Sequence, residues 1–301
     1  MRFSGHPDLR ESQVTPQHLF DQRRRKIMLA ATAWGMGWSN RFAFAASPET
    51  ADPMTALADI TGYNNYYEFS NDKKAVKVLA QALTLQPWTI TVEGEVEKPF
   101  TLDADDLFRL FGHEERIYRL RCVEGWAMVV PWSGFAISKL IERARPTSRA
   151  KFVEFESLKR SSEMIGQRTG SLPWPYREAL RIDEAMHPLA FAVTGLYGQP
   201  LPKQNGAPLR LAIPWKYGFK SAKAITRIRL AYEQPTTSWA QLAPSEYGFY
   251  GNVNPQVSHP RWSQARENRI GELQKRPTLP FNGYAEQVAD LYKGMDPKTL
   301  F

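Results

Sequence analysis

The sequence predicts an α+β fold in which β-strands predominate and the helices are short. Three observations support this prediction. Several segments alternate apolar and polar residues, which is the period of a half-buried strand. The 22 prolines and 19 glycines are spread through the 301 residues, which indicates many turns rather than one long helical array. Hydrophobic residues make up 43% and charged residues 23% of the chain, an ordinary globular composition.

The first half of the chain alternates predicted strands and short helices. Residues 88–94 alternate apolar and polar side chains and end at a glycine, as a half-buried strand does. Residues 101–107 supply capping groups and first-turn acids for a helix that reaches about residue 111. The other elements expected here are a strand over 117–123, a helix over 135–144 that Ser133 caps and Pro146 follows, and a strand over 151–156.

The second half is richer in strands. A short helix over 182–186 should stop at His187, because a residue that precedes proline avoids the helical conformation. Three further strands are expected over 189–193, 209–213 and 225–232. The C-terminal 60 residues are interrupted by prolines and are expected to be irregular. Neither an internal repeat nor a linker is present, so a single core is expected.

The N-terminus has the order of an export signal. Arg24 and Arg25 precede the short apolar stretch 27–38, and Ala43-Phe44-Ala45 offers a small-residue cleavage site. A pair of arginines at this place fits a twin-arginine signal, whose machinery exports folded proteins. The alternative is a basic amphipathic helix that belongs to the domain. We expect residues 1–45 to be a twin-arginine signal peptide for the periplasm, residues 46–60 a mobile leader, and residues 61–301 one domain.

The composition excludes several classes of protein. A single cysteine cannot form an intramolecular disulfide or a CxxC pair, and the five histidines lack the HxxxH and HxH spacings of zinc sites. An uninterrupted apolar run of about 18 residues, which a polytopic membrane protein needs, does not occur. The net charge of +8 falls when the basic N-terminus is removed, and the remaining charge is diffuse, so nucleic acid is not indicated as a partner.

Cys122 is the first candidate for chemistry. It ends the predicted strand 117–123, with Arg119 and Arg121 on the opposite face. These cations would lower the pKa of the thiol if their charges lie near it. The residues alone leave three roles open: a buried inert thiol, a nucleophile served by a histidine and an acid that the fold supplies, and a thiolate ligand of a metal that accepts sulfur.

The segment around Cys122 resembles the molybdenum-ligand segment of a known enzyme family. Residues 121–134 read Arg-Cys-Val-Glu-Gly-Trp-Ala-Met-Val-Val-Pro-Trp-Ser-Gly and are similar to that segment in the molybdoenzymes of the sulfite-oxidase fold. From residue 61 to residue 301 the chain further resembles the catalytic subunits of the periplasmic protein-methionine-sulfoxide reductases. The blocks that carry this narrower resemblance are 63–69, 204–210, 214–221, 246–255 and 259–264.

The resemblance implies a sulfite-oxidase-like, molybdopterin-binding fold and one molybdenum, held by one molybdopterin and by the thiolate of Cys122. Cys122 is then the metal ligand and the catalytic residue. The positions that match the family's other cofactor-binding residues are Asn64, Tyr67, Glu68, Ser157, Asn205, Arg210, Ser221, Ala222 and Lys223. Cations among them can neutralise a phosphate, and amides and hydroxyls can bond a heteroaromatic edge.

Two of these positions depart from the family pattern. Ser157 stands where threonine is expected, and it keeps the hydroxyl donor. Ser221 and Ala222 stand where glycine and a larger apolar residue also occur. If a glycine were needed at this place for a positive φ, the loop would have a different geometry here.

The resemblance also implies a function. The enzyme would reduce methionine sulfoxide in oxidised envelope proteins by oxygen-atom transfer, with electrons from a haem-binding integral membrane subunit. Oxidation makes a methionine side chain polar and disrupts cores, so repair has a use in the envelope. The alternatives are the same cofactor acting on small S- or N-oxides or sulfite, an envelope hydrolase or transpeptidase with a cysteine nucleophile, and a binding protein without enzyme activity.

Overall fold

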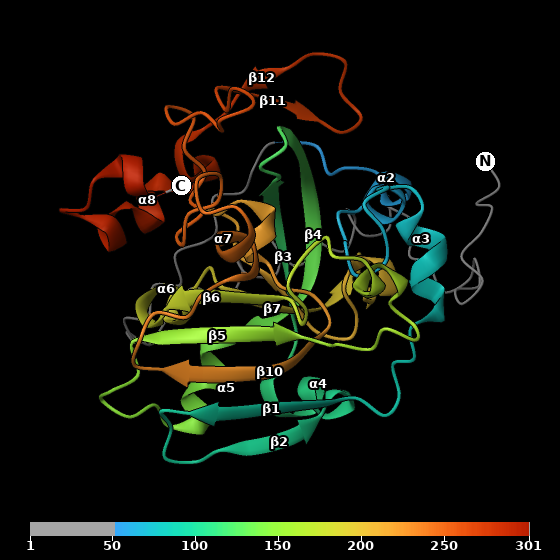
Figure 1. Ribbon diagram of the computed structural model, residues 1–301, viewed down its shortest axis with the longest axis vertical. Coiled ribbons are helices and arrows are strands. Elements are labelled where there is room, and N and C mark those ends of the chain that lie inside the picture. The colour runs from blue at the N-terminus through green and yellow to red at the C-terminus, as the bar shows by residue number, and fades with distance from the viewer. Residues whose placement is uncertain (1–51, 301) are drawn as a thin grey trace, which may run out of the picture.

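Two β-sheets form the framework of the protein, whose structure is a computed structural model that describes residues 52–300 (Figure 1). The first sheet has the order β2 (Phe100–Asp103), β1 (Thr89–Gly94), β10 (Ile225–Ala231), β5 (Phe152–Ser157), β6 (Arg177–Arg181). Strands β1 and β10 are parallel, and the other neighbours are antiparallel. The sheet is therefore mixed, as the α+β prediction requires.

The second sheet is built around one long strand, β4 (Trp126–Ala136). Along its main path the order is β12 (Arg276–Pro277), β11 (Arg266–Arg269), β4, β7 (Phe191–Leu196), β8 (Gln199–Pro200). Two more strands join this path, β3 (Glu114–Arg121) on β4 and β9 (Arg210–Ala212) on β7. Strand β11 runs parallel to the start of β4, so a C-terminal segment is placed beside the turn that follows β3 (Figure 1).

The helices are short, as predicted. The α-helices of the described residues are α2 (Leu57–Gly62), α3 (Val76–Leu79), α4 (Leu107–Phe111), α5 (Ile137–Ala144), α6 (Ile182–Met186), α7 (Ser238–Leu242) and α8 (Ala285–Val288). Single 3₁₀ turns are η2 (Ala80–Ala82), η3 (Ala104–Asp106), η4 (Ile165–Arg168), η5 (Lys203–Asn205), η6 (Gly218–Lys220), η7 (Pro280–Gly283), η8 (Ala289–Tyr292) and η9 (Pro297–Thr299). Over residues 52–300, none of the helices has the length and apolar character needed to span a membrane.

The predicted strands over 88–94, 151–156 and 225–232 are confirmed by β1, β5 and β10. The prediction missed β4, because it is buried on both faces along almost its whole length and so has no alternation to detect. Ser133, expected to cap the next helix, lies inside β4, and the cap position of α5 is Ala136.

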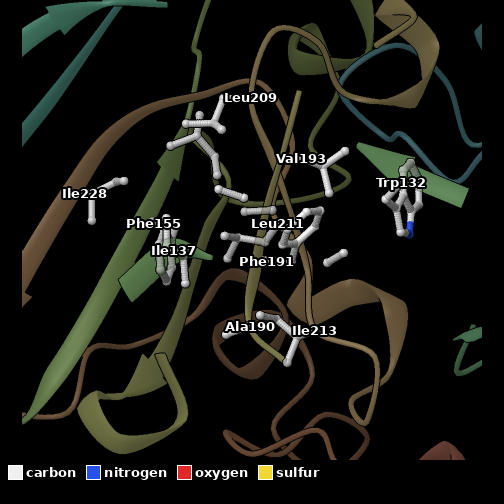
Figure 2. Packing of buried hydrophobic residues seen from close by; sticks show 14 of the residues in the cluster. Trp132, Ile137, Phe155, Ala190, Phe191, Val193, Leu209, Leu211, Ile213 and Ile228 are labelled. Atoms are coloured by element: carbon white, nitrogen blue, oxygen red, sulfur yellow. The ribbon is translucent and has the colours of Figure 1, made fainter. Parts of the chain in front are cut away.

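Buried side chains from both sheets meet in one core. Phe155 and Ile228 come from the first sheet, and Phe191 and Leu211 come from the second (Figure 2). All four are fully buried. Helix α5 adds Ile137 to this core, with Leu140, Ile141 and Ala144 on the same helix face. One core therefore joins the two sheets, and Cys122 lies outside it, in a small separate cluster with Val123, Tyr217, Tyr247 and Val253.

Residues 52–60, which the sequence assigns to a mobile leader, are packed in the structure. The backbone N–H of Thr55 donates to the Val129 carbonyl at 3.0 Å, and the Val129 N–H donates to the Thr55 hydroxyl at 3.0 Å. Asp52 forms ion pairs with Arg119 and Arg269. The expected signal peptide, residues 1–45, lies outside the described residues, as does the start of the leader.

Candidate active site

A cleft opens beside the end of β3, and Cys122 lies in its wall. The space inside it, including the part that is open to solvent, is about 950 Å³. It is lined by the segment after α2, the turn between β3 and β4, the loops around β9 and η6, and α7. The predicted site residues that line the cleft are Asn64, Tyr67, Glu68, Cys122, Asn205, Arg210 and Lys223. The fold thus gathers residues from distant parts of the chain at one place.

The other three predicted residues do not line the cleft. Ser157, Ser221 and Ala222 are buried, each with 4% or less of its surface exposed. Ser221 has φ −95°, so its backbone does not need a glycine, and its hydroxyl accepts a bond from the Ile213 N–H at 3.3 Å. The departure from the family pattern at this position therefore causes no backbone strain.

Cys122 sits in a tight turn that joins β3 to β4. Its N–H donates to the Trp126 carbonyl at 2.9 Å, and its own carbonyl accepts from Gly125 at 3.1 Å. Gly125 has φ +90°, a conformation that favours glycine. Two donors reach the sulfur: Asn65 Nδ2 at 3.3 Å and the Glu124 backbone N–H at 3.4 Å. Such donors stabilise negative charge on a sulfur atom.

In the protein without a metal the thiol stays protonated. Burial raises the pKa of Cys122 to about 12, and the nearby Glu124 carboxylate adds to this rise. Burial and the Glu124 carboxylate outweigh Arg121, which lowers the pKa of the thiol as predicted. Arg119 instead pairs with Asp52. A metal cation bound to the sulfur would supply the positive charge that displaces this proton.

Two residues beside the sulfur were not among the predicted site residues: Asn65 and Glu124. The Glu124 carboxylate accepts from Asn65 at 3.2 Å and from the Trp126 indole at 3.0 Å, and it pairs with Lys73 at 3.0 Å. Burial raises the pKa of Glu124, but the bonds from Asn65, Trp126 and Lys73 outweigh it and hold the pKa below its usual value. A carboxylate in a turn is usually solvated, so the sequence held no physical signal for this role.

The cleft lining also contains two cations, Arg210 and Lys223. Arg210, 4% exposed, donates to the backbone carbonyls of Asn205 and Leu211, and its guanidinium lies 4.8 Å from the Trp132 ring centroid. Burial lowers the pKa of Arg210 to about 10. Burial also lowers the pKa of Lys223 and raises that of Glu68. Two cations thus face one weakly acidic carboxyl group, and such a wall suits an anion.

Gly206 allows these two cations to come together. It has φ +104°, and a Cβ atom there would lie 2.8 Å from the Lys223 Cβ and 3.3 Å from the Arg210 Cβ. Any other residue would force one of the two side chains away. Position 206 therefore requires a glycine for two reasons: its backbone conformation and the lack of space for a Cβ atom.

Several buried polar atoms near the cleft have no hydrogen-bond partner within residues 52–300. They are Asn64 Nδ2, Asn65 Oδ1, Tyr66 Oη, Ser157 Oγ and Asn205 Oδ1. An unpaired buried polar atom costs about 1–3 kcal/mol, and native proteins rarely leave so many together. Donors, acceptors, two cations and a thiol are the groups that a metal-pterin with a phosphate requires, so the residues fit the implied cofactor.

The mouth of the cleft is aromatic. Tyr63 packs edge-on against Trp126, with ring centroids 5.3 Å apart. Tyr67 packs edge-on against Trp239 at 5.3 Å, and Trp239 lies 4.6 Å from Tyr247. All five rings line the cleft. This mouth offers contacts to an apolar or sulfur-containing side chain.

Metal binding by protein groups alone is not indicated. Within residues 52–300, groups of three or more His, Cys, Asp or Glu that could hold a metal do not occur. His187 and His259 lie outside the cleft lining. His187 bonds the Gln287 carbonyl at 3.1 Å, and His259 stacks on Trp262 at 3.7 Å.

Comparison with known proteins agrees with this arrangement. The family model described as "Oxidoreductase molybdopterin binding domain" matches residues 77–239. The "Protein-methionine-sulfoxide reductase catalytic subunit MsrP" of Ralstonia nicotianae is 52% identical over 322 residues, which cover 98% of this chain and 96% of that protein. The protein of the same name from Xanthomonas campestris pv. campestris is 56% identical, over 96% of this chain and 97% of that protein. Among solved structures, the sulfane dehydrogenase SoxCD of Paracoccus pantotrophus covers 86% of this chain and 67% of its own, with 16% identity and a TM-score of 0.45.

Proposed function

From the premise that this chain belongs to the family of protein-methionine-sulfoxide reductase catalytic subunits, we propose that its cleft at Cys122 is the place of reaction. The chain is an oxidoreductase that reduces methionine sulfoxide in proteins to methionine. The observation that carries the location is that one buried thiol, the buried cation Arg210, the half-buried cation Lys223 and unpaired polar atoms meet at a single cleft.

The cofactor of this reaction would be a molybdenum-molybdopterin, which when bound would supply the oxygen-atom transfer chemistry and the two electrons of the reduction. Cys122 would hold the metal through its sulfur, and Arg210 and Lys223 would hold the phosphate. The amides of Asn64 and Asn205, the hydroxyl of Tyr67 and the carboxyl group of Glu68 would bond the pterin. Ser157, Ser221 and Ala222 lie behind the lining, so their part would be to support the wall or to bond through the backbone.

The chain's own residues prepare the site in three ways. Asn65 and the Glu124 N–H donate to the sulfur of Cys122 and so stabilise the thiolate. Burial around the sulfur keeps water away and strengthens these bonds. The aromatic mouth contacts the side chain of the substrate, since aromatic edges bind sulfur-containing groups.

We further propose that the enzyme works in the periplasm. The support is the order of residues 1–45, which matches a twin-arginine signal. Export of a folded protein allows a cofactor to be inserted beforehand. The electrons would come from a haem-binding integral membrane subunit, which the resemblance to the family implies; the name of the relatives, a catalytic subunit, supports only the existence of a second subunit.

The deciding experiment is anaerobic turnover. Purified enzyme, a protein with oxidised methionines and a reduced viologen dye should consume dye and restore methionine, with about one molybdenum per chain by metal analysis. Free methionine sulfoxide and a small S-oxide are the comparison substrates. Turnover of the small oxides with none of the protein would assign a different oxo-substrate, and absence of molybdenum from active enzyme would refute the cofactor.

A further inference from the structure

The carbonyl of Val123, next to Cys122, accepts two side-chain hydrogen bonds from the C-terminal part of the chain. Trp262 Nε1 donates at 2.8 Å and Gln264 Nε2 at 2.7 Å. These residues follow Val123 by 139 and 141 positions. A carbonyl has two lone pairs, so both acceptor positions of this turn residue are occupied by one distant segment.

Gln264 also connects this carbonyl to Arg121. The Gln264 Oε1 atom accepts from Arg121 Nη2 at 2.8 Å, and Arg121 Nε pairs with Glu267 at 3.1 Å. Arg121 Nη1 donates to the carbonyl of Cys122 itself. Arg121 is fully buried and Gln264 is 2% exposed. The guanidinium therefore has no freedom to move without breaking the bonds of its neighbours.

The backbone of β11 completes this contact. The Asn268 N–H donates to the Gly125 carbonyl at 2.8 Å. The carbonyls of Cys122, Val123 and Gly125 thus all accept bonds from Arg121 or from residues 262–268. Between them, the N–H of Glu124 points to the sulfur of Cys122 at 3.4 Å. The orientation of the turn, and with it the direction of the sulfur, depends on bonds made on its far side.

We propose that Gln264 is a positioning residue for Cys122: it holds the Val123 carbonyl so that the sulfur points into the cleft in the orientation that the metal needs. Gln264 does not touch the sulfur and does not itself line the cleft; it contacts Val123, which does. The inference rests on the proposed function only in that the sulfur is a metal ligand. The effect of Gln264 passes through the backbone of the turn that carries Cys122. This turn is short enough for a small displacement of the Val123 carbonyl to change the direction of the sulfur.

Two variants separate the bonds of Gln264. Gln264→Leu removes both its bonds. Gln264→Glu keeps an acceptor for Arg121 but loses the donor to the Val123 carbonyl and places a carboxylate against it. If the bond to the Val123 carbonyl orients the sulfur, both variants should change the orientation of the sulfur in the same way. Gln264→Glu should be the more stable of the two, because its carboxylate can pair with Arg121.

Gln167 provides a matched control. It is a buried glutamine, 6% exposed, which donates to the Leu158 carbonyl at 2.8 Å and accepts from the Arg160 N–H at 2.9 Å. It does not line the cleft. Gln167→Leu therefore removes the same kind of bonds from a loop that does not carry Cys122.

The experiment has three readouts besides turnover. In the loaded enzyme, the electron paramagnetic resonance spectrum of Mo(V) and the midpoint potential report the sulfur–metal bond. In the cofactor-free protein, the rate of Cys122 alkylation by iodoacetamide reports the orientation and access of the sulfur. We expect both Gln264 variants to change the spectrum and potential and to alter the alkylation rate several-fold, with Gln167→Leu equal to wild type in all three.

Gln264 variants with a lower melting temperature but with the wild-type spectrum, potential and alkylation rate would overturn the proposal. Gln264 would then contribute to the stability of the fold and not to the orientation of the sulfur. Wild-type protein without molybdenum would refute the proposed function instead, and the alkylation rates would still test the positioning of the turn.

Discussion

Asn65 donates a hydrogen bond from its side-chain amide to the sulfur of Cys122, at 3.3 Å, although the two residues are 57 positions apart. Asn65 follows α2, and Cys122 follows β3. The same amide reaches the Glu124 carboxylate at 3.2 Å. One side chain thus joins the sulfur and the only carboxylate in its turn, and it fixes where negative charge can be held beside the cofactor.

Replacing Cys122 with serine should abolish turnover and leave the fold intact. A hydroxyl is a harder donor with a much higher pKa than a thiol, so it would not replace the sulfur at molybdenum. The two side chains are similar in size, and we expect the stability to change by about 2 kcal/mol or less. Metal analysis and a thermal melt check both parts. Full turnover by the serine variant would show that Cys122 is not the molybdenum ligand.

The double variant Arg210→Ala, Lys223→Ala should be purified with much less pterin and molybdenum. Each charge-assisted bond to a buried phosphate contributes roughly 1.5–3 kcal/mol, so the loss of two should exceed tenfold in affinity. Arg229→Ala, which removes a half-exposed cation on β10, is the control and should keep its cofactor. Wild-type pterin content in the double variant would show that the phosphate is held elsewhere.

The stability of the cofactor-free protein should fall in acid partly because of His187. Burial lowers the pKa of His187, and the bond to the Gln287 carbonyl opposes this only in part. The unfolded chain therefore takes up a proton near pH 6.5 while the folded chain does not, and stability is lost as the pH falls through this value. His187→Gln should show a shallower loss of melting temperature between pH 7 and pH 5. Equal slopes for the two proteins would contradict the assignment.

The buried pair of Lys216 and Glu184 should stabilise the C-terminal segment. Both side chains are fully buried, and the Tyr292 hydroxyl donates to the same carboxylate. Lys216→Met leaves the buried Glu184 carboxylate without its cation. Breaking a buried ion pair in this way lowers the free energy of unfolding by about 3–5 kcal/mol. Denaturant unfolding should show this loss. Adding Glu184→Gln should recover part of it, and a double variant as unstable as the single one would mean that packing alone was disturbed.

Export should need both Arg24 and Arg25. Replacing the two with lysine should leave unprocessed precursor in the cytoplasm, because twin-arginine signals are read by their paired arginines. Cell fractionation with an antibody against the chain measures this. Normal export of the variant would mean that Arg23 serves in a shifted register or that the N-terminus is not a signal of this kind.

Local patterns predicted much of the framework. Strands β1 and β5 alternate apolar and polar side chains because each has one face on the core and one toward solvent. Strand β4 has no such pattern, since neighbours cover both of its faces. Strand β6 reads Arg-Glu-Ala-Leu-Arg, which favours a helix, and pairing with β5 overrides that preference.

For the site, too, the sequence predicted some features and the tertiary structure alone decided others. The residue types alone left the role of Cys122 open, and it was the resemblance to the molybdoenzymes that selected Cys122, Arg210 and Lys223 as candidates; the structure places all three in the lining of one cleft. The roles of Asn65 and Gln264 depend on which atom each amide meets: the sulfur of Cys122, 57 positions from Asn65, and the backbone carbonyl of Val123, 141 positions from Gln264. Amides can bond almost any polar group, so only the packing of the two sheets decided which partner each one has.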